Sequence, residues 1–342
     1  MKPLVRAVAA ALLGAASATT PARAQDALLS VDTRLNRVVT LNPFDGSILN
    51  PGLITDANNP ATFDFQTPRA AIQVGSQIWV SDQSPNVNAI HRFDLSGAFL
   101  GSVGGNVAGG GLSNVRGLRY INGAVYAVNA GTTNGAPGAA LVRLDPLTGA
   151  ILGAFSTVAG GVGGSPWDVM WYGGRFLVSD GDSRALQLYD ADGTYFGALT
   201  GALNNIPQQM FLRANGNVLL AANGSVPLNS YGLYEIAPDG STVAQWTGGP
   251  GLGTRGVYEL GNGRYLIAES GGASATRGLG TIDPLGPRTN ANFQLIAGLY
   301  NGGWISPFVL PTTVIPEPAT VVLVGAGVAV LAAARGRRRG RG

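Results

Sequence analysis

Three arginines recur at one position of a degenerate repeat. Arg69, Arg116 and Arg255 each follow the first residue of a short apolar segment, and two further copies of this segment carry Trp167 and Gln208 at that position. An arginine guanidinium binds a carboxylate or a phosphate through two parallel hydrogen bonds, and an indole presents a flat apolar face on which a sugar ring can stack. If the copies lie side by side, these five side chains form one rim. We therefore expect the rim to bind an acidic polysaccharide.

Carboxylate and amide side chains end the next apolar segment of each copy. The six residues are Asp32, Asp82, Asn129, Asp180, Asn223 and Glu269. Such side chains cap turns by accepting hydrogen bonds from backbone amides, and they can also neutralise neighbouring arginines. Their oxygens are ligands that a hard cation such as Ca²⁺ prefers. The spacing does not decide between turn capping, neutralisation of arginines and cation binding. We include Asp82, Asp180 and Glu269 in the predicted rim. We predict no metal site, and Ca²⁺ is the one cofactor that these side chains would suit.

The residues for nucleophilic catalysis are scarce. The chain contains one histidine and no cysteine, so it has neither disulfides nor thiol chemistry. His91 lies in the apolar segment that ends at Asp94, which we place in the outer half of its repeat and away from the rim. A triad needs a base beside a serine and a carboxylate in a cleft. We therefore predict no catalytic residue.

The elements that must position the rim are short strands. A pattern of four apolar segments, separated by Gly, Asn, Asp or Pro, recurs about every 40–50 residues. The third segment of each copy is followed by a glycine turn: Gly46, Gly97, Gly149, Gly193, Gly240 and Gly286. Four strands per repeat of this length are typical of a propeller blade. The pattern predicts an all-β, six-bladed propeller over residues 25–312.

The first and last segments are expected to complete one blade. The chain enters the repeat at a second strand, Leu28–Asp32, and the missing inner strand is supplied by Trp304–Val309, which places Ile305 at the rim position. Pairing of these two strands closes the ring and removes two exposed sheet edges.

The repeats resemble NHL-type six-bladed propellers, whose blades often carry a strand that ends in Ser-Asp. Val80-Ser81-Asp82 and Val178-Ser179-Asp180 match this pattern, whereas the fifth copy departs from it, with Ala237 where the third strand should end in Asp. Related lactonase-type propellers hold Ca²⁺ or Zn²⁺ with Glu, Asn and Asp. The resemblance implies that the candidate ligands in this chain are Asp82, Asn129, Asp168, Asp180, Asn223 and Glu269. It specifies a fold and no single activity.

The N-terminus has the features of a secretory signal peptide. Lys2 and Arg6 precede an apolar run of twelve residues, Ala7–Ala18, and Ala22-Arg23-Ala24 offers a small-residue cleavage site. We expect signal peptidase to remove residues 1–24 and the rest of the chain to be exported.

The C-terminus predicts a membrane segment with a sorting signal. Pro316, Glu317 and Pro318 precede sixteen uncharged residues, 319–334, and five arginines follow. As a helix the uncharged run is about 24 Å long, which is short for a bilayer core, and the arginines should stay cytoplasmic. Residues 313–342 resemble the PEP-CTERM signal, which implies processing by an exosortase and transit through the inner membrane to the cell envelope, surface or surrounding matrix.

The charge balance of the predicted body excludes a general nucleic-acid binder. Residues 25–315 contain 14 arginines, no lysine and 18 acidic residues, a net charge of −4, so the basic character of the whole chain belongs to its ends. We expect an exported, non-catalytic propeller that binds a ligand or polysaccharide or has a structural role; the sorting signal implies an exopolysaccharide or biofilm context. The alternative is a secreted propeller enzyme: a lactonase, lyase or glycan hydrolase.

Overall fold

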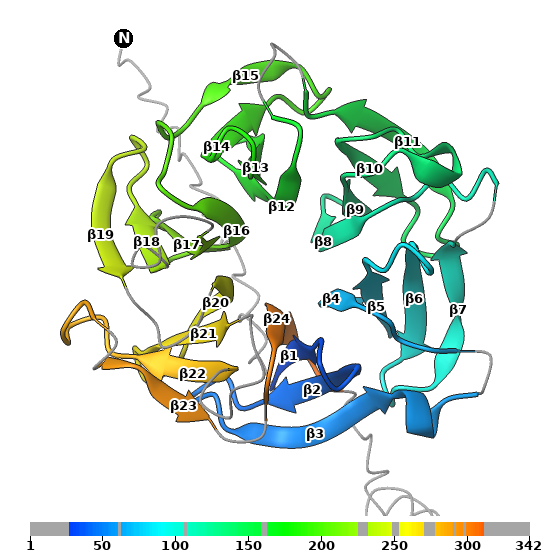
Figure 1. Cartoon of the computed structure of the whole chain (residues 1–342), viewed down its shortest axis with the longest axis horizontal. Coiled ribbons are helices and arrows are strands. Elements are labelled where there is room, and N and C mark those ends of the chain that lie inside the picture. Colours follow the sequence, from blue (N-terminus) through cyan, green and yellow to red (C-terminus); the bar gives the residue numbers. More distant parts are fainter. Residues whose placement is uncertain are drawn as a thin grey trace, which may run out of the picture. The chain divides into compact units, whose positions relative to one another are not determined.

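Six four-stranded antiparallel sheets form a ring around a central axis (Figure 1). The computed structural model describes residues 27–60, 63–105, 108–158, 163–224, 232–247, 253–269, 278–289, 292–296 and 299–310. All described strands belong to one compact unit that ends at Val309. The predicted all-β, six-bladed propeller is confirmed.

Each blade contains four strands, which follow one another from the axis outward. Blade 1 contains β24 (Gly302–Phe308), β1 (Ala27–Asp32), β2 (Arg37–Leu41) and β3 (Ile48–Thr55). Blade 2 contains β4 (Pro68–Val74), β5 (Gln77–Asp82), β6 (Ala89–Asp94) and β7 (Phe99–Gly104). Blade 3 contains β8 (Val115–Ile121), β9 (Ala124–Asn129), β10 (Ala140–Leu144) and β11 (Ile151–Ser156).

The other three blades repeat this order. Blade 4 contains β12 (Pro166–Tyr172), β13 (Arg175–Asp180), β14 (Ala185–Tyr189) and β15 (Tyr195–Ala198). Blade 5 contains β16 (Ile206–Leu212), β17 (Val218–Asn223), β18 (Gly232–Ile236) and β19 (Thr242–Thr247). Blade 6 contains β20 (Thr254–Glu259), β21 (Tyr265–Glu269), β22 (Leu279–Ile282) and β23 (Gln294–Ile296). Two short 3₁₀ turns, η1 (Asp56–Asn58) and η2 (Thr133–Gly135), lie in loops.

The ring closes by pairing the two ends of the propeller. β24 pairs with β1 in antiparallel register, with Ala27 opposite Phe308 and Asp32 opposite Gly302. This confirms the predicted closure. The closing strand begins at Gly302, two residues before the predicted start at Trp304.

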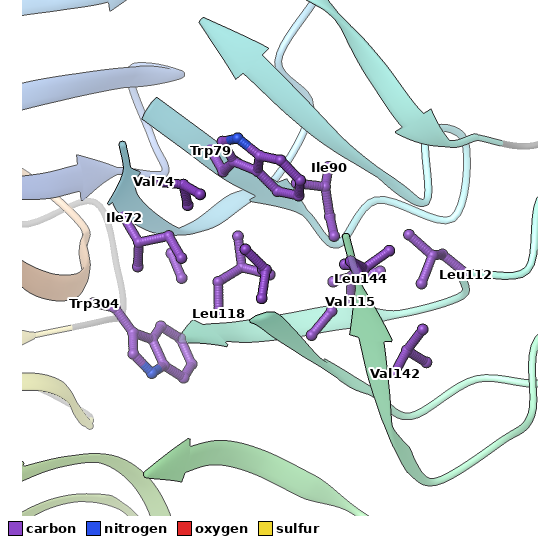
Figure 2. Close-up of a cluster of buried hydrophobic side chains, with 13 residues drawn as sticks. Ile72, Val74, Trp79, Ile90, Leu112, Val115, Leu118, Val142, Leu144 and Trp304 are labelled. Atoms are coloured by element: carbon purple, nitrogen blue, oxygen red, sulfur yellow. The ribbon is translucent and has the colours of Figure 1, made fainter. Parts of the chain in front are cut away.

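Apolar side chains fill the seams between blades because successive residues of a strand point to opposite faces of its sheet. Trp79 of β5 packs toward blade 3 in a cluster with Leu118, whereas its neighbours Ile78 and Val80 pack toward blade 1. Trp304 of β24 reaches the same cluster as Trp79 and Leu118 (Figure 2). β5 therefore packs against blade 3 with one face and against blade 1 with the other.

The repeated glycine turns allow one blade to contact the next. Gly97 has φ +93°, and a Cβ there would lie 2.1 Å from the carbonyl oxygen of Leu53 in blade 1. Gly240 has φ +83°, and its Cβ would lie 1.7 Å from the carbonyl oxygen of Leu199, which follows β15 of blade 4. Only glycine tolerates both the left-handed backbone and this approach.

The serines of the Val-Ser-Asp pattern link neighbouring inner strands. Ser81 Oγ accepts a hydrogen bond from the amide of Ala70 and donates one to the carbonyl of Arg116 in blade 3. Ser179 Oγ accepts from the amide of Asp168 and donates to the carbonyl of Gln208 in blade 5. In both copies of the Val-Ser-Asp pattern, the serine therefore links the inner strand of its own blade to that of the next blade.

Buried polar side chains connect the remaining inner strands. Arg119 of β8 donates to Asp168 of β12 at 2.8 Å and to the carbonyl of Met210 in β16. Gln209 of β16 donates to the carbonyl of Ile305 and accepts from the amides of Ile305 and Val257, at 2.9 and 3.0 Å. Arg119 therefore connects blades 3, 4 and 5, and Gln209 connects blades 5, 6 and 1.

No helix among the residues that the structure describes is long and apolar enough to span a membrane. The predicted signal peptide, the Pro316-Glu317-Pro318 signal and the predicted span over residues 319–334 lie outside the described residues.

Candidate functional site

The three arginines occupy equivalent positions in their inner strands. Each follows the residue that pairs with the polar end of the second strand: Pro68 with Asp82, Val115 with Asn129, and Thr254 with Glu269. The register shifts by one residue directly after each of these pairs. A bulge of this kind re-aims a side chain without breaking the strand. The predicted equivalence of Arg69, Arg116 and Arg255 is thus seen in the strand pairing.

Two members of the predicted rings are misplaced by the sequence pattern. In blade 1, Gly302 pairs with Asp32, so Gly303 and not Ile305 occupies the arginine position. A Cβ at Gly303 would lie 2.4 Å from the carbonyl oxygen of Arg69, which explains why this position has no side chain. In blade 5, Pro207 pairs with Ala222, so Asn223 lies one residue beyond the ring. Gln208 keeps its predicted place.

Arg69 and Arg255 are half-buried and only partly hydrogen-bonded. Arg69 Nε donates to Gln83 Oε1, whereas its Nη1 is buried without a hydrogen-bond partner. Burial lowers the pKa of Arg69 to about 10, opposed by the charge of Asp82. Nε and Nη1 of Arg255 are also buried without a hydrogen-bond partner. Both guanidinium groups keep donors that no protein acceptor uses.

Arg116 is nearly buried and lies against Trp167. Its side chain donates through Nη1 to Ser165 Oγ (2.9 Å) and to the carbonyl of Pro166 (2.8 Å), and its Cζ lies 3.8 Å from the centre of the Trp167 ring. Burial, followed by the charge of Arg69, lowers the pKa of Arg116 to about 10. The charges of Asp180 and Asp182 oppose this lowering.

Trp167 is not the freely exposed indole that the sequence suggests. It is half-buried, Arg116 lies over its ring, and the indole of Trp304 runs parallel to it with 6.4 Å between ring centres. Because blade 1 and blade 4 lie on opposite sides of the ring, this pair meets across the axis (Figure 1). Trp167 therefore fills the centre and holds Arg116, which leaves less of its face for a sugar.

The aspartates of the second ring cap loops, as one of the predicted roles required. Asp82 accepts from the amides of Gln66, Thr67 and Ser84 at 2.7–3.0 Å. Asp180 accepts in the same way from the amides of Ser165 and Ser183. Burial raises the pKa of Asp82, and these hydrogen bonds together with Arg69 oppose the rise. Each carboxylate joins the loop before the inner strand to the loop after the second strand.

Asp82 and Asp180 act on Arg69 and Arg116 through their charge, but neither carboxylate forms an ion pair with these arginines. The ion pairs among the described side chains involve Arg37, Arg119, Arg175 and Arg213, and none involves Arg69, Arg116 or Arg255. Glu269 is buried at the end of β21. Within the described ranges, no three Asp, Glu, His or Cys side chains come together as a metal site would require. The candidate metal ligand Asp168 instead pairs with Arg119.

Gln208 stands out among the buried polar groups. It is 1% exposed, and neither Oε1 nor Nε2 has a hydrogen-bond partner. Buried polar atoms are nearly always satisfied by protein, water or ion. A donor and an acceptor thus remain open at the rim position of blade 5.

A polar pocket of about 410 Å³ opens beside Arg69, at the seam between blades 2 and 3. Its lining is rich in amides and hydroxyls: Thr67, Arg69, Gln83, Ser84, Pro85, Asn88, Ser113, Asn114 and Thr133. Gln83 links Arg69 to Asn114, and the Asn114 amide donates to Asn88 Oδ1. Sequence reasoning missed these residues because they lie in loops outside the repeat. The signal available was position: Gln83 directly follows Asp82 and Asn114 precedes β8.

Comparison with known proteins identifies a fold. A protein of unknown function from Bacteroides caccae superposes with a TM-score of 0.58 at 14% identity, covering 82% of this chain and 98% of the other. A putative gluconolactonase superposes with a TM-score of 0.50 at 15% identity, covering 75% of this chain and 83% of the other. A streptogramin B lyase structure superposes with a TM-score of 0.50 at 14% identity, covering 81% of this chain and 82% of the other. No protein-family model and no curated protein matches the sequence. These likenesses show the propeller fold alone.

Proposed function

We propose that this protein is an exported propeller whose arginine-bearing face binds an acidic polysaccharide. The single observation that carries the proposal is that Arg69, Arg116 and Arg255 occupy equivalent places on one face and form no ion pair with a carboxylate of the described residues, although three aspartates lie in the adjacent ring. A guanidinium with open donors suits the carboxylate of a uronic acid. The amides and hydroxyls beside Arg69 supply partners for sugar hydroxyls.

Binding, and not catalysis, is the role that this face supports best. Asp82 and Asp180 accept hydrogen bonds from backbone amides and Asp168 pairs with Arg119, so none of these three carboxylates is placed to act directly as a base on this face. The enzyme names of two structural neighbours belong to those proteins, and the likeness to them is one of fold. The export signals and the PEP-CTERM-like tail support delivery to the envelope or matrix, where such polymers occur.

The test is binding of the full chain to alginate or polygalacturonate, with dextran as the neutral comparison. We expect binding to the two acidic polymers only, weakening as salt is raised because partly exposed charges are screened. A charge-assisted hydrogen bond contributes about 1.5–3 kcal/mol, so replacing Arg69, Arg116 and Arg255 by alanine should weaken binding at least ~10-fold.

A matched control separates the site from net charge. Arg143 and Arg288 are exposed and Arg175 is partly exposed, and none of the three lies at the start of an inner strand or the end of a second strand. Replacing all three by alanine therefore removes the same charge away from the rim. This control should bind as the wild type does. Equal loss in both triple variants, or undiminished binding by the folded rim variant, would show that the arginine face is not the site.

A further inference from the structure

His91 lies in an aromatic pocket in the outer half of blade 2. It is on β6, 6% exposed, with ring centres 5.0 Å from Phe63, 5.7 Å from Phe65 and 6.2 Å from Phe99. The position on a third strand, away from the arginines, is as predicted. The sequence did not reveal what lies next to it.

A serine and an aspartate flank the two nitrogens of this imidazole. His91 Nδ1 lies 2.8 Å from Oγ of Ser102, its cross-strand partner on β7. His91 Nε2 lies 4.0 Å from Oδ2 of Asp82 and has no hydrogen-bond partner. An acceptor beside Nε2 favours the tautomer that carries its proton there, because a neutral imidazole has one donor and one acceptor nitrogen. Nδ1 is then free to accept the Ser102 proton.

This order of groups is that of an activated nucleophile: a hydroxyl, a base within hydrogen-bond reach, and a third group that orients the base. The distance to Asp82 is longer than a hydrogen bond, as is common before a substrate binds. Burial lowers the pKa of His91 to about 4. The imidazole is therefore neutral throughout the neutral range, in the form that accepts a proton, and this low pKa makes it a weaker base than an exposed histidine.

The nucleophile opens onto a cavity. Ser102 is exposed, and both it and His91 line a pocket of about 430 Å³. Phe63, Phe99, Val87 and Ala89 form the apolar part of the lining, whereas Asp64, Gln66 and Asn86 form the polar part. The apolar part suits a short acyl chain. The carboxylate of Asp64 disfavours an anionic substrate, and the side-chain amide of Asn86 is a donor of the type that stabilises an oxyanion.

We propose that Ser102 is a nucleophile activated by His91, with Asp82 as the positioning residue, and that this pocket hydrolyses uncharged short-chain acyl esters. Ser102 Oγ attacks the carbonyl carbon while its proton passes to His91 Nδ1; the carbon–oxygen bond to the alcohol then breaks, and the alcohol takes that proton. Water attacks the acyl-serine, and the carboxylic acid leaves as the proton returns through Nδ1 to Oγ. The site shares Asp82 with the second ring of the arginine face, but its pocket is separate from the pocket beside Arg69.

The first test is covalent labelling of the full chain with a fluorophosphonate, read by peptide mass spectrometry. Ser96 is an internal control, because it is exposed in the same blade and its hydroxyl bonds the carboxylate of Asp94 and no imidazole. General-base assistance predicts labelling of Ser102 about 100-fold faster than of Ser96 or more. His91→Phe, which suits the aromatic surroundings, should reduce the Ser102 rate to that of Ser96. Equal rates at the two serines in the wild type would overturn the proposal.

A second measurement keeps the proposal testable if His91→Phe does not fold. Ser102→Cys changes an exposed residue, and its alkylation rate can be compared with that of Ser96→Cys; the cysteine beside the imidazole should react faster at neutral pH. Because the chain has one histidine, ¹⁵N-histidine labelling of protein without a histidine tag reports the tautomer directly. The Asp82 role requires the Nε2–H form, and a dominant Nδ1–H form, or equal alkylation of the two cysteines, would contradict the proposal.

Discussion

At the scale of single residues, Gln209 performs the task that backbone pairing performs elsewhere. Its side-chain amide bonds three backbone groups on two neighbouring inner strands, β20 and β24, at a point where the strands of different blades do not pair. Buried backbone groups without partners are costly. One glutamine therefore satisfies groups that no sheet ladder reaches.

Replacing Gln209 by leucine should destabilise the propeller without altering its surface. The change leaves the amides of Val257 and Ile305 and the carbonyl of Ile305 without these partners, and each unsatisfied group costs about 1–3 kcal/mol. We expect the free energy of unfolding to fall by about 3 kcal/mol or more, measured by denaturant unfolding. Gln73→Leu is a comparison variant, since Gln73 bonds Val309 at the margin of the fold. An equal or smaller effect at Gln209 would contradict its bridging role.

His91 should make the stability depend on pH. Its folded pKa, about 4, lies below the ordinary value of 6.5, so between these values the unfolded chain binds a proton that the folded chain does not. The stability is therefore complete above pH 6.5 and falls as the pH is lowered toward 4. The loss amounts to about 3 kcal/mol over this range.

The measurement for His91 is denaturant unfolding across this pH range in wild type and in His91→Phe. The phenylalanine variant lacks the titrating group, so the difference between the two isolates the contribution of His91. Parallel pH profiles for both proteins would show that the imidazole is not held neutral by burial.

At the scale of elements, the repeat was enough to predict which segments form strands and in which order they lie. The errors are errors of register. Asn223 ends an apolar run just as Asp82 does, but the pairing of β17 with β18 aligns Ala222 with Asp82. The predicted start of β24 at Trp304 leaves out Gly302 and Gly303, which are glycines because Ala268 and Arg69 approach them closely.

The sequence was enough to predict which blade positions carry the site residues, but not which side chains surround them. Equivalent repeat positions placed Arg69, Arg116 and Arg255 on one face. The contact of Arg116 with Trp167, and that of Trp167 with Trp304, join residues of three blades, and no local pattern encodes such a meeting. For the same reason the Ser102–His91 pair was invisible, since it depends on the register between β6 and β7.

The closing strand should be required for a stable propeller. A chain that ends at Asn301 lacks β24, which exposes an edge of β1 and removes Trp304 from the cluster in Figure 2. Loss of a large buried aromatic side chain alone costs about 3–5 kcal/mol, a large share of the stability of a typical domain. Thermal unfolding should show a strongly lowered midpoint or insoluble protein, and a chain that ends at Leu310 is the control. Unchanged stability on removal of β24 would refute closure by this strand.

At the scale of the whole molecule, the tail predicts processing. If Pro316-Glu317-Pro318 is recognised by an exosortase, the protein recovered outside the inner membrane should lack the residues that follow. Mass spectrometry of the C-terminal peptide from envelope and medium fractions is the measurement, and replacing Pro316, Glu317 and Pro318 by alanine should leave the tail uncut. Arg341 in the mature external protein would rule the prediction out.

Both ends of the propeller leave from one side. The inner strand β24 starts at the arginine face and ends at Phe308 on the opposite face, where Ala27 of β1 begins beside it. In blade 2, the corresponding strands β4 and β5 are joined there by Gly75 and Ser76. The two ends thus lie where the other blades have a hairpin turn between the first and second strands. Both ends are on the face opposite the arginines. A tether at either of these two ends would therefore be attached to the propeller at the face opposite Arg69, Arg116 and Arg255.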